Sequence, residues 1–191
     1  MLQDRLLKTV AEGKGTKSTI AVREPNLWWP HLMHEDPGYL YTLKVSLSKG
    51  SEIDVYRLKF GIRSVSFNNT DGVLINHRKF YFTGFGRHED SDFRGKGLDL
   101  PLVAKDFNLI KWTNANSFRT SHYPYAEEIM DFADENGIAI IDETPGKITL
   151  NDMIPHTQNY MCKKLFYQVT TNRLQVSPSG GSATANCWPT I

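Results

Sequence analysis

The stretch NANSFRTSHYPYAEEIMDFADENGIAIIDETPG, residues 114–146, decides the fold. It opens with residues 115–120, which we predict to form a strand. One face of a helix then follows, because apolar residues recur at the i, i+3, i+4, i+7 spacing, at Ala126, Ile129, Met130 and Ala133. Gly137 is placed to end that helix. The apolar run 138–141 predicts another strand, buried on both faces as a strand of a parallel sheet is.

The same alternation extends upstream of this stretch. Residues 79–85, KFYFTGF, predict a short apolar strand. Asp99 is a suitable cap for a helix with Pro101 at its second position, and apolar residues follow at helical spacing, at Val103, Phe107 and Ile110. The order strand, helix, strand, helix, strand favours a parallel sheet, so residues 73–146 are expected to be α/β.

Residues 18–75 have a different pattern. Apolar and polar residues alternate from Tyr39 to Ser48, which predicts a half-buried strand. The pattern resumes from Tyr56 to Ile62 after the turn at 49–51, so the two segments are expected to form a hairpin. Short strands separated by turns favour a β-sandwich of immunoglobulin type.

Polar side chains cluster at the end of each strand predicted in the α/β region. The clusters are Arg87 to Asp90, Arg119 to His122, and Asp142 with Glu143. Chemistry in parallel α/β folds collects at the carboxyl ends of the strands. Each cluster also has a structural explanation, since His122 before Tyr123-Pro124 could serve a turn. Three such clusters at successive strand ends favour a functional site.

Composition narrows the function. Charged residues make up 23% of the chain and the formal net charge is +1, without a basic patch, so neither nucleic acid nor a membrane surface is an expected partner. No apolar run approaches the roughly 18 residues that a membrane span needs. Cys162 and Cys187 lack histidines at ligand spacing, so no metal site and no cofactor are expected.

Three further segments bear on the compartment of the protein and on the order of the chain. Residues 1–17 lack the apolar core of a signal peptide, which predicts either an intracellular protein or a missing N-terminus, and the compartment stays unknown. Asn68-Asn69-Thr70 is an N-glycosylation triplet that matters for a secreted chain. Residues 147–191 continue no pattern, and 176–191 are rich in Ser, Gly, Thr and Pro, so we expect a disordered tail.

Several segments together resemble the β-glucuronidases of glycoside hydrolase family 2. They are FGIRSV at 60–65, LINHRKFYFTGFGRHED at 74–90, RGKGLD at 94–99 and the stretch at 114–146, while 26–47 resembles the domain that precedes the barrel. The resemblance implies a partial immunoglobulin-like β-sandwich at 1–72. It also implies the first part of a TIM (β/α)8 barrel, three strands long, at 73–146, and a non-family tail at 147–191.

The resemblance also implies a chemistry, the retaining hydrolysis of β-D-glucuronides by two carboxylates about 5 Å apart. Arg119 would orient the nucleophile, and His88 and His122 would hydrogen-bond sugar hydroxyls. Four acidic residues would support the site without cleaving: Glu89, Asp90, Asp142 and Glu143. The segment W-S-x-x-N-E that carries the acid/base glutamate is absent from this sequence, as is the later nucleophilic glutamate, so no residue here is expected to be catalytic.

Three interpretations of function therefore stand at this stage. The first is a glycosidase by family that is inactive as this chain alone. The second is a non-catalytic fragment that acts through binding or assembly with a full-length relative, since the family forms tetramers. The third is a chain without function. The family is lysosomal in animals and cytoplasmic in bacteria.

Overall fold

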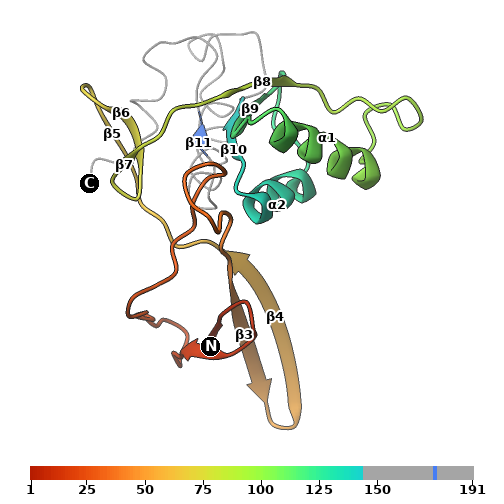
Figure 1. Cartoon of the computed structure of the whole chain (residues 1–191). Helices are drawn as coiled ribbons and strands as arrows, with labels where there is room; N and C mark the ends of the chain where they lie inside the picture. Colours follow the sequence, from red (N-terminus) through yellow and green to blue (C-terminus); the bar gives the residue numbers. More distant parts are fainter. Residues whose placement is uncertain (144–173, 176–191) are drawn as a thin grey trace, which may run out of the picture. The chain divides into compact units, whose positions relative to one another are not determined.

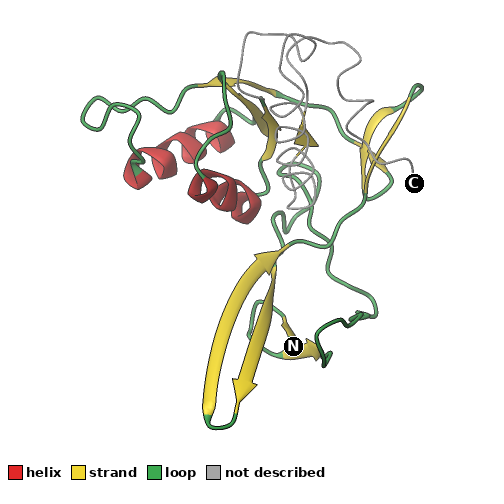
Figure 2. Cartoon of the chain, turned by 180° about the vertical axis from the view of Figure 1, so that it is seen from behind, coloured by secondary structure: helices red, strands yellow, loops and turns green. Residues whose placement is uncertain are grey.

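The computed structural model describes residues 1–143 and 174–175. Within it the chain divides into two compact units, Met1–Tyr81 and Phe82–Ile191. The first unit is built of strands and loops, whereas the second alternates strands with helices (Figures 1 and 2). Each unit has the character that the sequence predicts for its part of the chain.

The main sheet of the first unit is antiparallel, with the strand order β2-β1-β3-β4. Its strands are β1 (Leu2–Gln3), β2 (Thr9–Ala11), β3 (Tyr41–Lys49) and β4 (Glu52–Phe60). The long β3–β4 hairpin turns at Gly50, whose φ of 62° suits a residue without a side chain. The predicted hairpin is therefore confirmed.

One face of this hairpin is apolar. The cross-strand pairs on it include Leu43 with Leu58 and Val45 with Tyr56. The described residues leave much of this face uncovered, since Leu47 is 73% and Tyr56 66% exposed. The alternation in the sequence thus corresponds to an apolar face of the hairpin that is largely exposed among the described residues.

A buried tryptophan organises the rest of the first unit. Trp28 is fully buried and its backbone N–H donates to the carbonyl of Ile62 at 2.8 Å. The Asn76 amide donates to the Trp28 carbonyl at 2.9 Å and accepts from the Ser64 N–H at 2.9 Å. These bonds hold the loop around Trp28 beside a small antiparallel sheet of β5 (Val65–Asn68), β6 (Gly72–Ile75) and β7 (Arg78–Lys79).

The described sheet of the second unit is parallel, with the order β11-β10-β9-β8. Its strands are β8 (Gly84–Arg87), β9 (Ser117–Thr120), β10 (Ala139–Asp142) and β11 (Leu174–Gln175). The helices α1 (Leu100–Trp112) and α2 (Glu127–Asn136) connect successive strands and lie on one side of the sheet (Figure 1). In a TIM barrel, too, successive strands of the chain lie side by side in parallel, and the helices lie on one face of the sheet.

Local signals at the helix ends match the sequence. The Asp99 carboxylate accepts from the Leu102 N–H at 3.2 Å and so caps α1, and Gly137 ends α2 with a φ of 68°. Both helices bury their apolar faces in one core with β9 and β10. The core contains Val103, Phe107, Ile110, Ala115, Phe118, Tyr125, Ile129, Met130, Ala133, Ile138 and Ile140.

One prediction about strands is wrong. The apolar run 79–85 is not one strand, because Phe80 is buried with the β5–β7 sheet while β8 begins at Gly84. The Asn116 side chain fixes the start of β8 by accepting from the Thr83 N–H at 2.9 Å. Residues 73–146 hold three strands of the parallel sheet, β8, β9 and β10, as predicted, and two residues of the predicted tail, β11, pair in parallel with β10. Two residues carry no periodic signal, so β11 was invisible in the sequence. The rest of the predicted tail lies outside the described residues.

Gly84 is expected to be intolerant of substitution. A Cβ at this position would collide with the backbone carbonyl of Ser117, where β8 and β9 are paired. Gly84→Ala should therefore lower the free energy of unfolding by about 1–3 kcal/mol, measured by urea denaturation followed by circular dichroism. Gly86→Ala is the matched control in the same strand, since its Cβ would meet only the ends of two side chains, the Ser121 hydroxyl at 3.0 Å and Nη1 of Arg119 at 3.8 Å. Equal losses in both variants would contradict this account.

Candidate active site

The site lies at the edge of the second unit where β8, β9 and β10 end. In the parallel register Arg87 is opposite Thr120, and Arg119 is opposite Ile141. The residues that follow these positions therefore emerge together at the carboxyl ends of the strands. This is where the sequence places its candidate residues.

Arg119, His122 and Glu143 form the centre of the site. Nη2 of Arg119 lies 2.8 Å from Oε2 of Glu143, and Nδ1 of His122 lies 3.6 Å from the same oxygen. The Glu143 side chain is only 9% exposed, whereas that of Arg119 is 43% exposed. A nearly buried carboxylate thus anchors a guanidinium whose remaining surface faces solvent. Oε2 of Glu143 has no hydrogen-bond partner among the described residues, so its contact with Arg119 is an ion pair.

The protonation pattern of His122 follows from its neighbour. Nη2 of Arg119 and Nδ1 of His122 are 3.1 Å apart. A guanidinium can only donate, so in this contact Nδ1 is the acceptor and the ring proton sits on Nε2. The Nε2–H group is then the donor that His122 offers to a ligand.

His88 completes the exposed part of the site. Its ring packs edge-on against that of His122, with centroids 5.6 Å apart, and its Nδ1 lies 3.7 Å from Asp90. Asp90 also lies 3.4 Å from Nζ of Lys96, which donates to the Tyr123 hydroxyl at 2.7 Å. Lys96 therefore links the loop after β8 to the loop after β9.

Asp142 is beneath the site and does not line it. Its side chain is fully buried, and Oδ1 accepts from the Thr120 hydroxyl at 3.1 Å. The same hydroxyl accepts from the Glu143 backbone N–H at 2.8 Å. Asp142 and Thr120 thus fix the end of β10 against β9 and orient Glu143.

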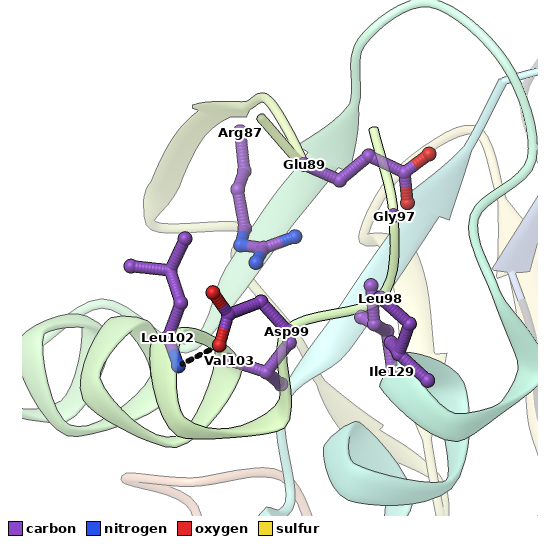
Figure 3. A pocket seen from close by; sticks show the side chains of 8 residues that line it. All are labelled: Arg87, Glu89, Gly97, Leu98, Asp99, Leu102, Val103 and Ile129. Atoms are coloured by element: carbon purple, nitrogen blue, oxygen red, sulfur yellow. Dashed lines mark hydrogen bonds between the residues drawn. The ribbon is translucent and has the colours of Figure 1, made fainter. Parts of the chain in front are cut away.

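Glu89 turns away from the exposed site toward a small cavity. Burial raises the pKa of its carboxyl, while the Tyr123 hydroxyl, the Arg87 charge and the Ala126 N–H oppose that rise. The cavity measures about 10 Å³, which suits one water molecule and excludes a sugar. Figure 3 shows the side chains around it: Arg87, Glu89, Gly97, Leu98, Asp99, Leu102, Val103 and Ile129.

Sequence reasoning missed the supports behind the site. Arg87 is buried and its Nη2 lies 2.7 Å from Asp106, a partner on α1 that no local pattern reveals. The Tyr125 hydroxyl donates to the Arg87 carbonyl and accepts from the Ser121 N–H at 3.1 Å. Burial raises the pKa of Tyr125 to about 12, so it stays protonated as this donor. Tyr125 therefore ties the end of β8 to the turn after β9.

No cluster of three or more His, Cys, Asp or Glu side chains within residues 1–143 and 174–175 is arranged to hold a metal ion. In the same part of the chain, neither helix has the length and apolar character that crossing a bilayer requires. What the site presents is a guanidinium and two imidazoles, which suit oxygen-rich ligands such as sugars.

Family models match nearly the whole described chain. Residues 67–177 match "Glycosyl hydrolases family 2, TIM barrel domain", and residues 3–63 match "Glycosyl hydrolases family 2". The chain belongs to glycoside hydrolase family 2. The family's fold, a sandwich domain followed by the start of a TIM barrel, is consistent with the two units. The barrel match passes residue 146, where the sequence resemblance was expected to end.

The relatives that match are β-glucuronidases. The human enzyme is 53% identical over 153 residues, covering 76% of this chain and 23% of its own length. The mouse enzyme is 52% identical over 140 residues, covering 73% of this chain and 22% of its own length. The chain thus spans about a quarter of the length of these family members.

Solved structures agree with this family assignment. The β-D-glucuronidase from Dictyoglomus thermophilum is 36% identical with a TM-score of 0.76, covering 97% of this chain and 35% of that one. The β-glucuronidase from Ruminococcus gnavus in complex with D-glucuronic acid is 37% identical with a TM-score of 0.77, covering 92% and 30%. This level of identity supports the family as well as the fold.

The raised pKa of Glu89 predicts a dependence of stability on pH. The unfolded carboxyl ionises at lower pH than the folded one, so folding is penalised as pH rises through the folded pKa and above it. Below the unfolded pKa both states are protonated and the penalty vanishes. Glu89→Gln keeps an acceptor for Tyr123 and Ala126 but cannot ionise.

We expect Glu89→Gln to raise the melting temperature at pH 7.5 and to leave it unchanged at pH 4. The measurement is thermal unfolding of both proteins across this range. Glu52→Gln, at the exposed start of β4, is the control and should show no such pH-dependent gain. A melting temperature that falls at pH 7.5 in the Glu89 variant would contradict the assignment.

Proposed function

We propose that the protein to which this chain corresponds hydrolyses β-D-glucuronides with retention, and that the chain supplies part of the sugar-binding edge. The observation that carries the proposal is the Arg119, His122 and Glu143 cluster at the carboxyl ends of parallel strands. The names of the matched relatives support the substrate class. The substrate class and the role proposed for each residue come from the resemblance to these relatives, and the proximity of Arg119, His122 and Glu143 supports the proposal.

In this proposal Arg119 supplies fixed positive charge at the point where the nucleophile and the sugar meet. Glu143 holds the Arg119 guanidinium on one side. The exposed surface of that guanidinium can orient a second carboxylate. The His122 Nε2–H and the His88 ring would donate to sugar hydroxyls. Hydrogen bonds from such preorganised donors become stronger as charge develops on the sugar in the transition state.

We further propose that the 191-residue chain is inactive by itself. The sequence contains no W-S-x-x-N-E segment. The acids at the site are poor substitutes, because Asp142 is buried beneath it and Glu143 is ion-paired with Arg119. Retaining hydrolysis needs two carboxylates in separate roles, so the loss of either removes most of the rate.

A chimera tests the proposal. Residues 67–143 of this chain would replace the matching segment of the human relative, and release of a chromophore from a β-D-glucuronide would be measured. The chimera should be active, and Arg119→Ala in it should lower kcat by about 10²-fold or more, since it removes charge stabilisation at the reacting centre. Lys105→Ala, on the exposed surface of α1, is the control and should have no effect.

Three results would overturn the proposal or a part of it. One is an active chimera in which Arg119→Ala and Lys105→Ala behave alike. The other is turnover by the purified 191-residue chain that scales with its concentration, which would contradict its inactivity. A chimera that folds but hydrolyses a β-galactoside in preference to a glucuronide would reject the substrate class.

A second candidate function, assembly with a full-length family member, is favoured by the apolar face of the β3–β4 hairpin. Leu47 and Tyr56 on this face are largely exposed in the described residues. Co-expression with the human relative and affinity purification tests it. Retention of the chain, lost in Leu47→Lys with Tyr56→Lys, would support assembly, and elution of the chain alone would reject it.

A further inference from the structure

We propose that Asn68 is an acceptor for an N-linked oligosaccharide. It lies in the triplet Asn68-Asn69-Thr70, and no second Asn-x-Ser/Thr triplet occurs in the sequence. Triplets of this kind arise by chance, so the triplet alone decides nothing. The structure adds three observations about the turn in which it lies.

The first observation is accessibility. Asn68 is the last residue of β5, and Asn69 and Thr70 lie in the turn to β6. All three residues are exposed. The whole triplet is therefore accessible in the folded chain, so a transferase need not act before folding.

The second observation is the conformation of the acceptor side chain. Oδ1 of Asn68 accepts from the Thr70 N–H at 2.9 Å and from the Asp71 N–H at 2.6 Å. These bonds form an Asx-turn, which fixes the amide plane relative to the Thr70 backbone. Nδ2 is left at the surface, where it donates to the exposed Asp71 carboxylate at 3.2 Å. That acceptor is movable and gives way without disturbing the fold.

The third observation is space. Asn68 pairs across the hairpin with Gly72, which has no side chain. Even a Cβ added at Gly72 would meet no atom within 4 Å. A sugar attached to Asn68 therefore extends into open space without displacing a packed group.

The reaction is a transfer from a polyprenyl diphosphate-linked oligosaccharide by a membrane-bound transferase. A bond forms between Nδ2 of Asn68 and C1 of the first sugar. The bond between C1 and the diphosphate oxygen breaks, and the polyprenyl diphosphate leaves with that electron pair. Nδ2 loses one proton to a base of the transferase, so the product is a neutral amide-linked glycan.

The test uses the folded, full-length chain with a purified single-subunit oligosaccharyltransferase and a lipid-linked oligosaccharide. We expect a mass gain of one glycan, located by peptide mapping to the fragment with Asn68. Asn68→Gln and Thr70→Ala should abolish the gain, and Thr70→Ser should retain it. Each variant is checked by circular dichroism, and all three changes lie on an exposed turn.

A synthetic peptide of residues 65–73 is the matched control in the same reaction. Modification of the peptide but not of the folded chain would overturn the proposal, because the turn would then be shielding Asn68. Failure of both would also overturn it, because the triplet itself would then be a poor acceptor. Modification of the Asn68→Gln variant elsewhere would show that the assignment to Asn68 is wrong.

Discussion

The hydroxyl of Thr120 is the contact on which the rest of the site depends. It accepts from the Glu143 backbone N–H and donates to the buried Asp142 carboxylate, joining the ends of β9 and β10. A buried hydroxyl satisfied in both directions fixes position more strictly than apolar packing, because each lost partner costs free energy. The direction of the Glu143 side chain follows from this junction, and Glu143 in turn holds Arg119.

The polar and charged groups at this edge differ in how deeply they are buried. Buried carboxylates and tyrosine hydroxyls fix the strand ends, while the guanidinium of Arg119 and the rings of His88 and His122 face solvent. The inner groups tolerate little change because they are desolvated and paired. The outer groups remain available to an oxygen-rich ligand. Such a division is consistent with the sugar-binding role proposed for this edge.

Much of this architecture could be predicted from the sequence because its signals are local. Asp99 marks the start of α1 because its side chain caps the helix. Gly137 marks the end of α2, and Gly50 the turn of the β3–β4 hairpin, because both adopt a positive φ that few other residues favour. The strand ends also predicted the edge at which Arg119, His122 and Glu143 meet, but Asp142 lies beneath that edge and Glu89 lines a separate cavity. The direction in which a side chain points could not be predicted from such local signals. Whether Asp142 points into the core depends on Thr120 across the sheet, which no pattern within β10 records.

Other misses have the same origin. The run 79–85 contributes to two sheets, and hydrophobic periodicity does not say which sheet buries a residue. The start of β8 at Gly84 is set by a hydrogen bond between the Thr83 N–H and the side chain of Asn116, a residue far along the chain. β11 is too short to produce a pattern and is defined only by its pairing with β10. Tertiary hydrogen bonds, invisible in a single sequence, set all three features.

The free energy of unfolding of Thr120→Val tests the account most directly. Valine keeps the shape of threonine but leaves the Glu143 N–H and the Asp142 carboxylate without this partner, so a loss of about 1–3 kcal/mol is expected. Thr120→Ser, which keeps the hydroxyl, should retain most of the stability. Thr113→Val, at the exposed end of α1, is the control: it removes a hydroxyl that donates to the Ile110 carbonyl at 2.9 Å outside the site, and it should cost less stability than Thr120→Val. A Thr120→Val protein as stable as the unsubstituted chain would contradict the claim that this hydroxyl holds the site together.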